Sequence, residues 1–275
     1  MKTRFVEVNV KDHLSPENRD ILTGLTRLPV ISHALESGAF ISGGFARQLL
    51  INGDIRRYLQ HPRRPGDIDF FFTSREVADN VVSFDQSLRR SQGGFAQESH
   101  TRINSLNMNV KLQFVTAPDL IFDTPTACMS RFDIYNCQVA LVGDKLVFPH
   151  DWFQLESQRL IRINNTSAPF MGTRLIKYLT DRGYVGIEDQ SRDALTEWLT
   201  RAATNSFTGF KPDHLHGISS AVKELQKRGH IMSEDLVLFM GKWKEMLAER
   251  QYGAYGVYTH VEVDWATHAI EQLSA

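Results

Sequence analysis

The chain has 275 residues, 42% of them hydrophobic and 23% charged, which suffices for one large domain or two small ones with real cores. Its 31 lysines and arginines balance 32 aspartates and glutamates, which excludes a protein that coats nucleic acid through overall positive charge. No apolar run approaches the roughly 20 residues of a membrane span, and two cysteines are too few for a disulfide scaffold or zinc cage. The N-terminus lacks a signal-peptide pattern, so we expect a cytoplasmic protein without membrane contact.

The first fifth of the chain predicts helices around one short buried strand. Ser15 followed by Pro16 is a typical helix start, and Pro29 ends the apolar stripe that follows. The run at 39–42 is apolar and bounded by glycines, as in a buried strand. In chain order we therefore expect a helix at 16–28, a short helix up to residue 38, a strand at 39–42 and a helix at 45–51.

The next part of the chain predicts three further strand segments. Residues 54–66 carry four arginines and two prolines and indicate an exposed loop. Alternation of apolar and polar residues indicates half-buried strands, and a glycine between two such runs indicates a hairpin. The expected elements are a strand at 67–72, a helix at 75–90, a strand at 109–114 and a hairpin over 134–148.

After about residue 155 the strand signals fade and helical periodicity dominates. Helices are expected at 171–182, 190–203, 217–228 and 233–250. The pattern predicts an α+β fold in which a mixed sheet with flanking helices occupies residues 1–160 and a helical domain occupies 161–275.

Two carboxylates stand two residues apart in the strand at 67–72. Residues i and i+2 of a strand point to the same face, so Asp67 and Asp69 share one side while Ile68 and Phe70 point into the core. Such a pair suits divalent cations, usually Mg²⁺, in phosphoryl transfer. The alternative is that Asp67 caps a turn and Asp69 is solvated at an edge.

The upstream glycines favour the functional interpretation. A strand that ends in Gly43-Gly44 and opens a helix allows a phosphate to approach backbone N–H groups, and Arg47 one turn later can hold a phosphate oxygen. A glycine pair by itself often serves only a turn.

In order, ISGGFARQLL (41–50) and GDIDFFF (66–72) resemble the signature of the DNA polymerase β-type nucleotidyltransferase superfamily. Within it the likeness is to the head domain of class II tRNA CCA-adding enzymes and bacterial poly(A) polymerases. Gly43, Gly44 and Arg47 match, whereas Gln48 stands where that family usually has aspartate. The resemblance implies a nucleotidyltransferase-type mixed sheet, two Mg²⁺ ions on Asp67 and Asp69, and an NTP substrate.

Two later stretches resemble the same family. In residues 130–163 Arg131 and Asp133 occupy the positions that, by resemblance, contact the sugar, although they also fit a turn acid and its solvated partner. In residues 172–184 Arg174 and Lys177 fit a helix that contacts the base or phosphates. The CCA-adding enzymes have an acidic pair that helps to read the incoming base, where this chain has Phe170 and Met171. The resemblance therefore does not extend to their selection of CTP and ATP.

The neighbouring strand shows a further departure. Many members of the superfamily carry a third carboxylate there, and this chain has Lys111 and Gln113 instead. The resemblance implies an enzyme that transfers a nucleoside monophosphate to an acceptor hydroxyl, most readily an RNA or tRNA-like 3′ end. Transfer to a small-molecule or protein hydroxyl, and a non-catalytic nucleotide- or RNA-binding descendant, remain alternatives. The base, the acceptor, the number of nucleotides added and the oligomeric state are not specified by the sequence.

Overall fold

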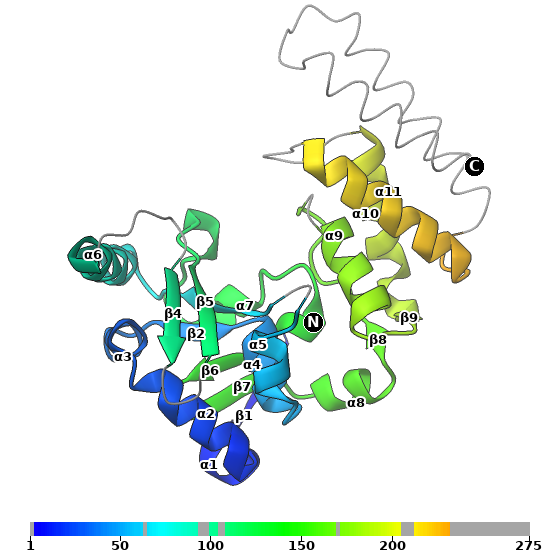
Figure 1. The fold of residues 1–275 in the computed structure, drawn as a ribbon. Coiled ribbons are helices and arrows are strands. Elements are labelled where there is room, and N and C mark those ends of the chain that lie inside the picture. The colour runs from blue at the N-terminus through cyan, green and yellow to red at the C-terminus, as the bar shows by residue number, and fades with distance from the viewer. Residues whose placement is uncertain are drawn as a thin grey trace, which may run out of the picture. The chain divides into compact units, whose positions relative to one another are not determined.

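The computed structural model describes residues 3–62, 65–92, 99–103, 108–168, 171–204 and 212–231 (Figure 1). Contacts divide the chain into two compact units. Unit 1 comprises residues 1–132 and 136–152, and unit 2 comprises residues 133–135 and 153–275. The helix expected at 233–250 lies outside the described residues.

Unit 1 is built on a seven-stranded mixed sheet with the order β1-β7-β6-β2-β3-β5-β4. Within the described part of this sheet, β3–β5 is the one parallel pairing, because the chain crosses over through α6 between these two strands. The strands are β1 (Phe5–Asn9), β2 (Phe40–Ser42), β3 (Asp67–Phe71), β4 (Ser99–Ile103), β5 (Met108–Phe114), β6 (Ala140–Val142) and β7 (Lys145–Pro149).

The helices of unit 1 begin where the sequence offers a cap. The Ser15 hydroxyl accepts a hydrogen bond from the N–H of Asn18 at 3.3 Å, and Pro16 takes the first helical position of α2. The helices are α1 (Val10–His13), α2 (Pro16–Thr26), α3 (Pro29–Glu36), α4 (Gly44–Leu50), α5 (Ile55–Leu59), α6 (Arg75–Gln92) and α7 (Pro125–Met129). A 3₁₀ turn covers Pro118–Leu120.

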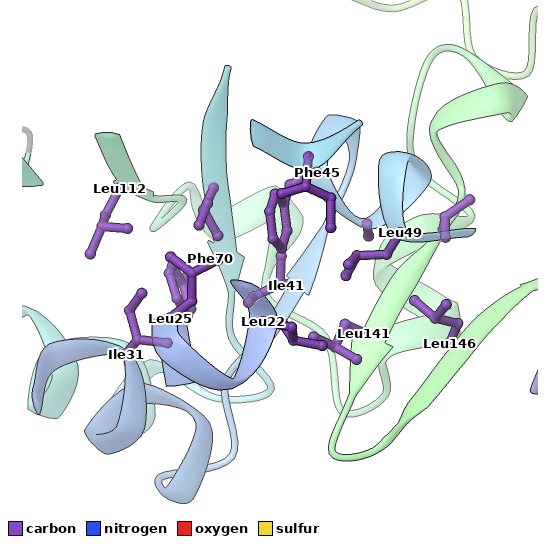
Figure 2. Packing of buried hydrophobic residues seen from close by; sticks show 14 of the residues in the cluster. Leu22, Leu25, Ile31, Ile41, Phe45, Leu49, Phe70, Leu112, Leu141 and Leu146 are labelled. Carbon is purple, nitrogen blue, oxygen red and sulfur yellow. The ribbon is translucent and has the colours of Figure 1, made fainter. Parts of the chain in front are cut away.

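The core of unit 1 lies between the sheet and its helices. Figure 2 shows side chains of α2, α3 and α4 converging on side chains from β2, β3, β5, β6 and β7. The labelled members are Leu22, Leu25, Ile31, Ile41, Phe45, Leu49, Phe70, Leu112, Leu141 and Leu146. Burying one such side chain contributes roughly 1.5–3 kcal/mol, so the core fixes β2, β3 and α4 against one another.

Unit 2 is mainly helical. Its elements are α8 (Trp152–Ser157, whose first residue belongs to unit 1), β8 (Leu160–Ile161), α9 (Met171–Ile176), β9 (Gly186–Ile187), α10 (Arg192–Thr204) and α11 (Pro212–Lys227). β8 and β9 pair in parallel. Helices α9 and α11 cross closely, because a Cβ at Gly172 would lie 2.8 Å from the carbonyl oxygen of Gly217.

The α+β fold expected from the sequence is confirmed, and three local expectations need correction. The stretch at 54–66 is not wholly a loop, because α5 forms within it. The first strand of the hairpin is only β6, since Ile134 bridges Ile163 and a 3₁₀ turn covers Tyr135–Cys137. The helix expected at 171–182 continues after α9 as a π-helical turn, Lys177–Asp181.

The hairpin correction has a physical cause. The N–H of Tyr135 donates to the carbonyl of Arg162, and the N–H of Ile134 donates to the Asp133 carboxylate. These bonds take residues 133–135 away from the sheet of unit 1. The functional boundary at 160/161 stays a prediction. No described helix has both the length and the apolar character that crossing a membrane requires.

Candidate active site

The predicted carboxylate pair lies on β3 in the middle of the sheet of unit 1. Asp67 and Asp69 are half-buried, whereas Ile68 and Phe70 are fully buried, as the alternation of the sequence predicts. β3 runs antiparallel to β2, and its register places Asp69 opposite Ser42. The strand pairing therefore brings Asp69 next to the turn that leaves β2.

That turn depends on glycine. Gly43 adopts φ +85° and ψ −137°, a backbone conformation that residues other than glycine rarely adopt. A Cβ built at Gly43 would lie 3.4 Å from the Asp69 Oδ2 atom, so the Asp69 carboxylate faces the turn. The N–H of Gly43 and the hydroxyl of Ser42 both donate to the carbonyl of Val139, at 3.1 and 2.7 Å. The turn is thereby fixed to residue 139, just before β6.

The donor set at this site fits a hard divalent cation. Two carboxylates from one strand face supply the oxygen ligands that Mg²⁺ prefers, and Gly43 adds no side chain at the point that the Asp69 carboxylate faces. In the parallel pairing with β5, Lys111 lies opposite Asp67 and Gln113 opposite Asp69. Among the described residues no three His, Cys, Asp or Glu side chains gather as a metal cluster.

Two arginines predicted to bind nucleotide also lie in unit 1. Arg47 follows the turn in α4 and is 2% exposed. Arg131 is exposed, and its guanidinium lies 5.7 Å from the centre of the Phe122 ring. The two arginines thus differ in exposure, and the nucleotide-binding role of each stays a prediction.

Unit 2 holds a second polar site around a buried carboxylate. Asp133 is 2% exposed; its Oδ1 atom accepts the N–H of Ile134 at 3.0 Å and pairs with the guanidinium of Arg174 on α9. Its Oδ2 atom is buried without any hydrogen-bond partner. A buried oxygen without a partner costs about 1–3 kcal/mol, so this atom is a candidate acceptor for a ligand hydroxyl.

The remaining predicted residues flank that pair. Lys177 is half-buried and begins the π-helical turn, a local structure often found at functional sites. Met171 is fully buried, whereas Phe170 lies outside the described residues. The fold thus assembles two groups, Gly43, Gly44, Asp67 and Asp69 in unit 1, and Asp133 with Arg174 in unit 2. Their roles stay predictions.

One residue of the site escaped the sequence analysis. Tyr58 on α5 is 9% exposed, and its hydroxyl donates to the carbonyl oxygen of Asp67 at 3.3 Å. The spacing of Ile55, Tyr58 and Leu59, at i, i+3 and i+4, is a helical apolar face that the surrounding arginines and prolines obscure.

Comparisons with solved structures identify the fold. One match is to a Thermotoga maritima CCA-adding enzyme complexed with tRNA, with a TM-score of 0.51 and 14% identity over 96% of this chain and 70% of that one. Another is to a CCA-adding enzyme with CTP, with a TM-score of 0.50 and 13% identity over 97% of this chain and 70% of that one.

The chain has the nucleotidyltransferase fold. The likeness covers most of this chain. The sequence matches no family model and no curated protein. The two solved structures are 14% and 13% identical to this chain, so they show its fold alone.

Proposed function

We propose that the chain is a metal-dependent nucleotidyltransferase that transfers a nucleoside monophosphate from an NTP to an acceptor hydroxyl. The observation that carries the proposal is the pair Asp67 and Asp69 on one face of β3, with the Asp69 carboxylate against the Gly43 turn. Two carboxylates on one strand face repel each other, and a divalent cation shared between them relieves that repulsion.

The proposed chemistry is a single displacement at phosphorus. The acceptor oxygen forms a bond to the α-phosphorus, the bond from that phosphorus to the bridging oxygen breaks, pyrophosphate leaves, and the hydroxyl proton passes to solvent. Asp67 and Asp69 would hold two Mg²⁺ ions. Bound there, the ions would lower the pKa of the acceptor hydroxyl and neutralise charge on the departing pyrophosphate.

The chain's own residues orient the nucleotide in this proposal. The turn at Gly43-Gly44 admits the triphosphate close to the backbone, because neither position carries a side chain. In unit 2, taken by itself, the Oδ2 atom of Asp133 would accept a hydroxyl of a ligand, and the ion pair with Arg174 holds the Asp133 carboxylate in its orientation. Residues 1–160 would form the catalytic domain and 161–275 a neck-like helical domain.

For the acceptor we propose an RNA, such as a tRNA-like 3′ end. The proposal draws on the fold shared with an enzyme solved with tRNA and another solved with CTP. A second candidate is a non-catalytic nucleotide-binding protein, which the register of β5 favours. Lys111 opposite Asp67 places a positive charge where a third carboxylate would strengthen cation binding.

A labelling experiment tests the proposal. The protein is incubated with each α-labelled NTP in turn, with Mg²⁺ and total RNA, beside the Asp67→Asn/Asp69→Asn variant. We expect label in RNA with wild type alone. Label in an added hydroxyl compound or in protein, with none in RNA, would reassign the acceptor. No transfer to any acceptor, together with Mg²⁺-dependent NTP binding, would support the non-catalytic candidate.

A further inference from the structure

Tyr58 connects the two motifs of the candidate active site. It lies on α5, beside α4 in the sheet's helical layer (Figure 1). A Cβ built at Gly44 would meet the Tyr58 hydroxyl oxygen at 2.5 Å, and a Cβ built at Gly66 would meet its ring at 2.3 Å. The side chain therefore fills the space between the glycine turn and the residue that precedes Asp67.

Hydrogen bonds hold this arrangement at both ends. The Tyr58 hydroxyl donates to the carbonyl oxygen of Asp67 at 3.3 Å, and the N–H of Gly66 donates to the carbonyl oxygen of Tyr58 at 2.8 Å. The ring also lies 6.4 Å from the ring of Phe45 in α4. One side chain thus contacts the helix after the turn, the turn's second glycine and the start of β3.

This packing provides a second reason why glycine stands at positions 44 and 66. A glycine beside a phosphate site is usually explained by close approach of the ligand to the backbone. Here both glycines are also required by Tyr58, because any side chain at either position would overlap with it. The two explanations make different claims about the same residue and can be separated by substitution.

We propose that Tyr58 is a positioning residue that sets the spacing between the glycine turn and Asp67, and thereby the geometry in which Mg²⁺ and the NTP triphosphate are held. The inference rests on the proposed function. Asp69 is paired on both sides, with Ser42 of β2 and Gln113 of β5, whereas Asp67, the first residue of β3, is paired only with Lys111 of β5. The Tyr58 hydroxyl supplies a constraint at that end.

The first test is Tyr58→Phe, which removes the hydroxyl and keeps the ring. Calorimetric titration measures NTP binding as a function of Mg²⁺ concentration, and thermal unfolding in EDTA measures folding without metal. One lost hydrogen bond corresponds to a factor of roughly three to ten, so we expect the Mg²⁺ concentration for half-maximal NTP binding to rise by about that factor.

Tyr184→Phe is the matched control. Tyr184 is equally a buried tyrosine, and its hydroxyl donates to Glu156 in unit 2. Tyr184→Phe should lower the unfolding temperature in EDTA and leave the Mg²⁺ dependence of NTP binding unchanged. A shift in Mg²⁺ dependence as large as that of Tyr58→Phe would mean that general destabilisation explains both, and would overturn the inference.

A double substitution tests the packing itself. Gly44→Ala meets the Tyr58 hydroxyl at 2.5 Å, but the next ring atom lies at 3.4 Å, an ordinary contact. Gly44→Ala/Tyr58→Phe should therefore unfold in EDTA at about the same temperature as Tyr58→Phe alone, and at a higher temperature than Gly44→Ala. Gly66→Ala meets ring carbons at 2.3 to 2.6 Å, which phenylalanine keeps, so Tyr58→Phe should not rescue it.

The outcomes separate this inference from the proposed function. If wild type shows no Mg²⁺-dependent NTP binding, the proposed function fails and the inference fails with it. If wild type binds and Tyr58→Phe binds identically, the positioning role alone is wrong. If Gly44→Ala lowers the unfolding temperature in EDTA as much in the Tyr58→Phe background as in wild type, the packing explanation of Gly44 is overturned.

Discussion

The two carboxylate sites of this chain are constructed in opposite ways. Asp67 and Asp69 in unit 1 are half-buried, lie two residues apart on one strand face, and adjoin a turn without side chains. Asp133 in unit 2 is buried and has a cationic partner in Arg174, which lies 41 residues away in the chain. One site places two carboxylates on the same strand face, and the other pairs a single carboxylate with an arginine.

This difference shows what each site can contribute. Concentrated carboxylates repel one another and gain from a divalent cation, so the site in unit 1 is suited to metal chemistry. A paired carboxylate with one unpartnered oxygen has no need of a cation and can accept a hydrogen bond from a neutral hydroxyl. The unit 1 site should matter for activity, and the unit 2 site for folding and orientation.

The largest expected effect is on activity in unit 1. Asp69→Asn keeps the shape of the side chain and removes one negative charge from the face of β3. We expect nucleotidyl transfer to fall by about a thousandfold, equivalent to roughly 4 kcal/mol of transition-state stabilisation. Rate measurements at saturating Mg²⁺ check the fall, and urea unfolding checks that stability is unchanged or higher. A large loss of stability would contradict a site assembled for a cation.

The next effect is on stability in unit 2. Arg174→Ala leaves Asp133 buried without its cationic partner, and breaking a buried pair typically costs about 3–5 kcal/mol. Because the Arg174 side chain is 43% exposed, we expect a value at the lower end. Urea unfolding gives the number, and Asp133→Asn/Arg174→Ala should recover part of it. If Arg174→Ala and the double variant lose the same free energy of unfolding, the pair does not stabilise unit 2.

A smaller effect concerns the pH dependence of unit 2. The Nε2 atom of His230 accepts the N–H of Ile187 at 3.3 Å. Burial lowers the pKa of His230, and the positive charge of Arg228 lowers it further. Asp189 raises this pKa and Arg192 lowers it, both by smaller amounts. The folded state therefore favours the neutral ring, and the unfolded state takes up the proton first as the pH falls.

The sign of this dependence is fixed. The stabilisation of the folded state by neutral His230 is fully present above the unfolded-state pKa, about 6.5, and is lost as the pH falls below that value. Unfolding free energies measured at several pH values should fall less steeply for His230→Gln than for wild type. Parallel curves for the two proteins would show that His230 does not couple folding to pH.

The smallest effect is a difference between two thiols of unit 1. Burial raises the pKa of Cys128 to about 12, and its Sγ atom donates to the carbonyl of Leu120 at 3.1 Å. Cys137 is only partly buried. Under native conditions at pH 8 we expect a thiol reagent to modify Cys137 before Cys128, as mass spectrometry of digested protein would show. Addition of Mg²⁺ and NTP should further slow the modification of Cys128 if they bind to unit 1.

Local sequence patterns predicted the parts of the site that depend on one strand or one helix. The alternation around Ile68 placed Asp67 and Asp69 on a common face, and the capping residues of α2 marked its start. The role of Tyr58 was missed, because it depends on contacts with Gly44 and Gly66 across the fold. Two-residue strands such as β8 are too short to leave a periodic pattern.

The ion pair in unit 2 was missed for a related reason. Each partner was predicted to contact a nucleotide, but their pairing requires the chain to bring α9 back against residues 133–135. The register of β5 against β3 likewise had to be observed before Lys111 could be placed opposite Asp67. Long-range pairings of this kind are set by tertiary packing and leave no local signal.

The most direct measurement of the central claim is calorimetric titration of wild type and Asp67→Asn/Asp69→Asn with each NTP, in Mg²⁺ and in EDTA. If the carboxylates of β3 hold the cations of a nucleotidyltransferase, wild type binds at least one NTP far more tightly in Mg²⁺ than in EDTA, and the double variant loses this difference while remaining folded. NTP binding that is the same in both solutions and in both proteins would contradict the account.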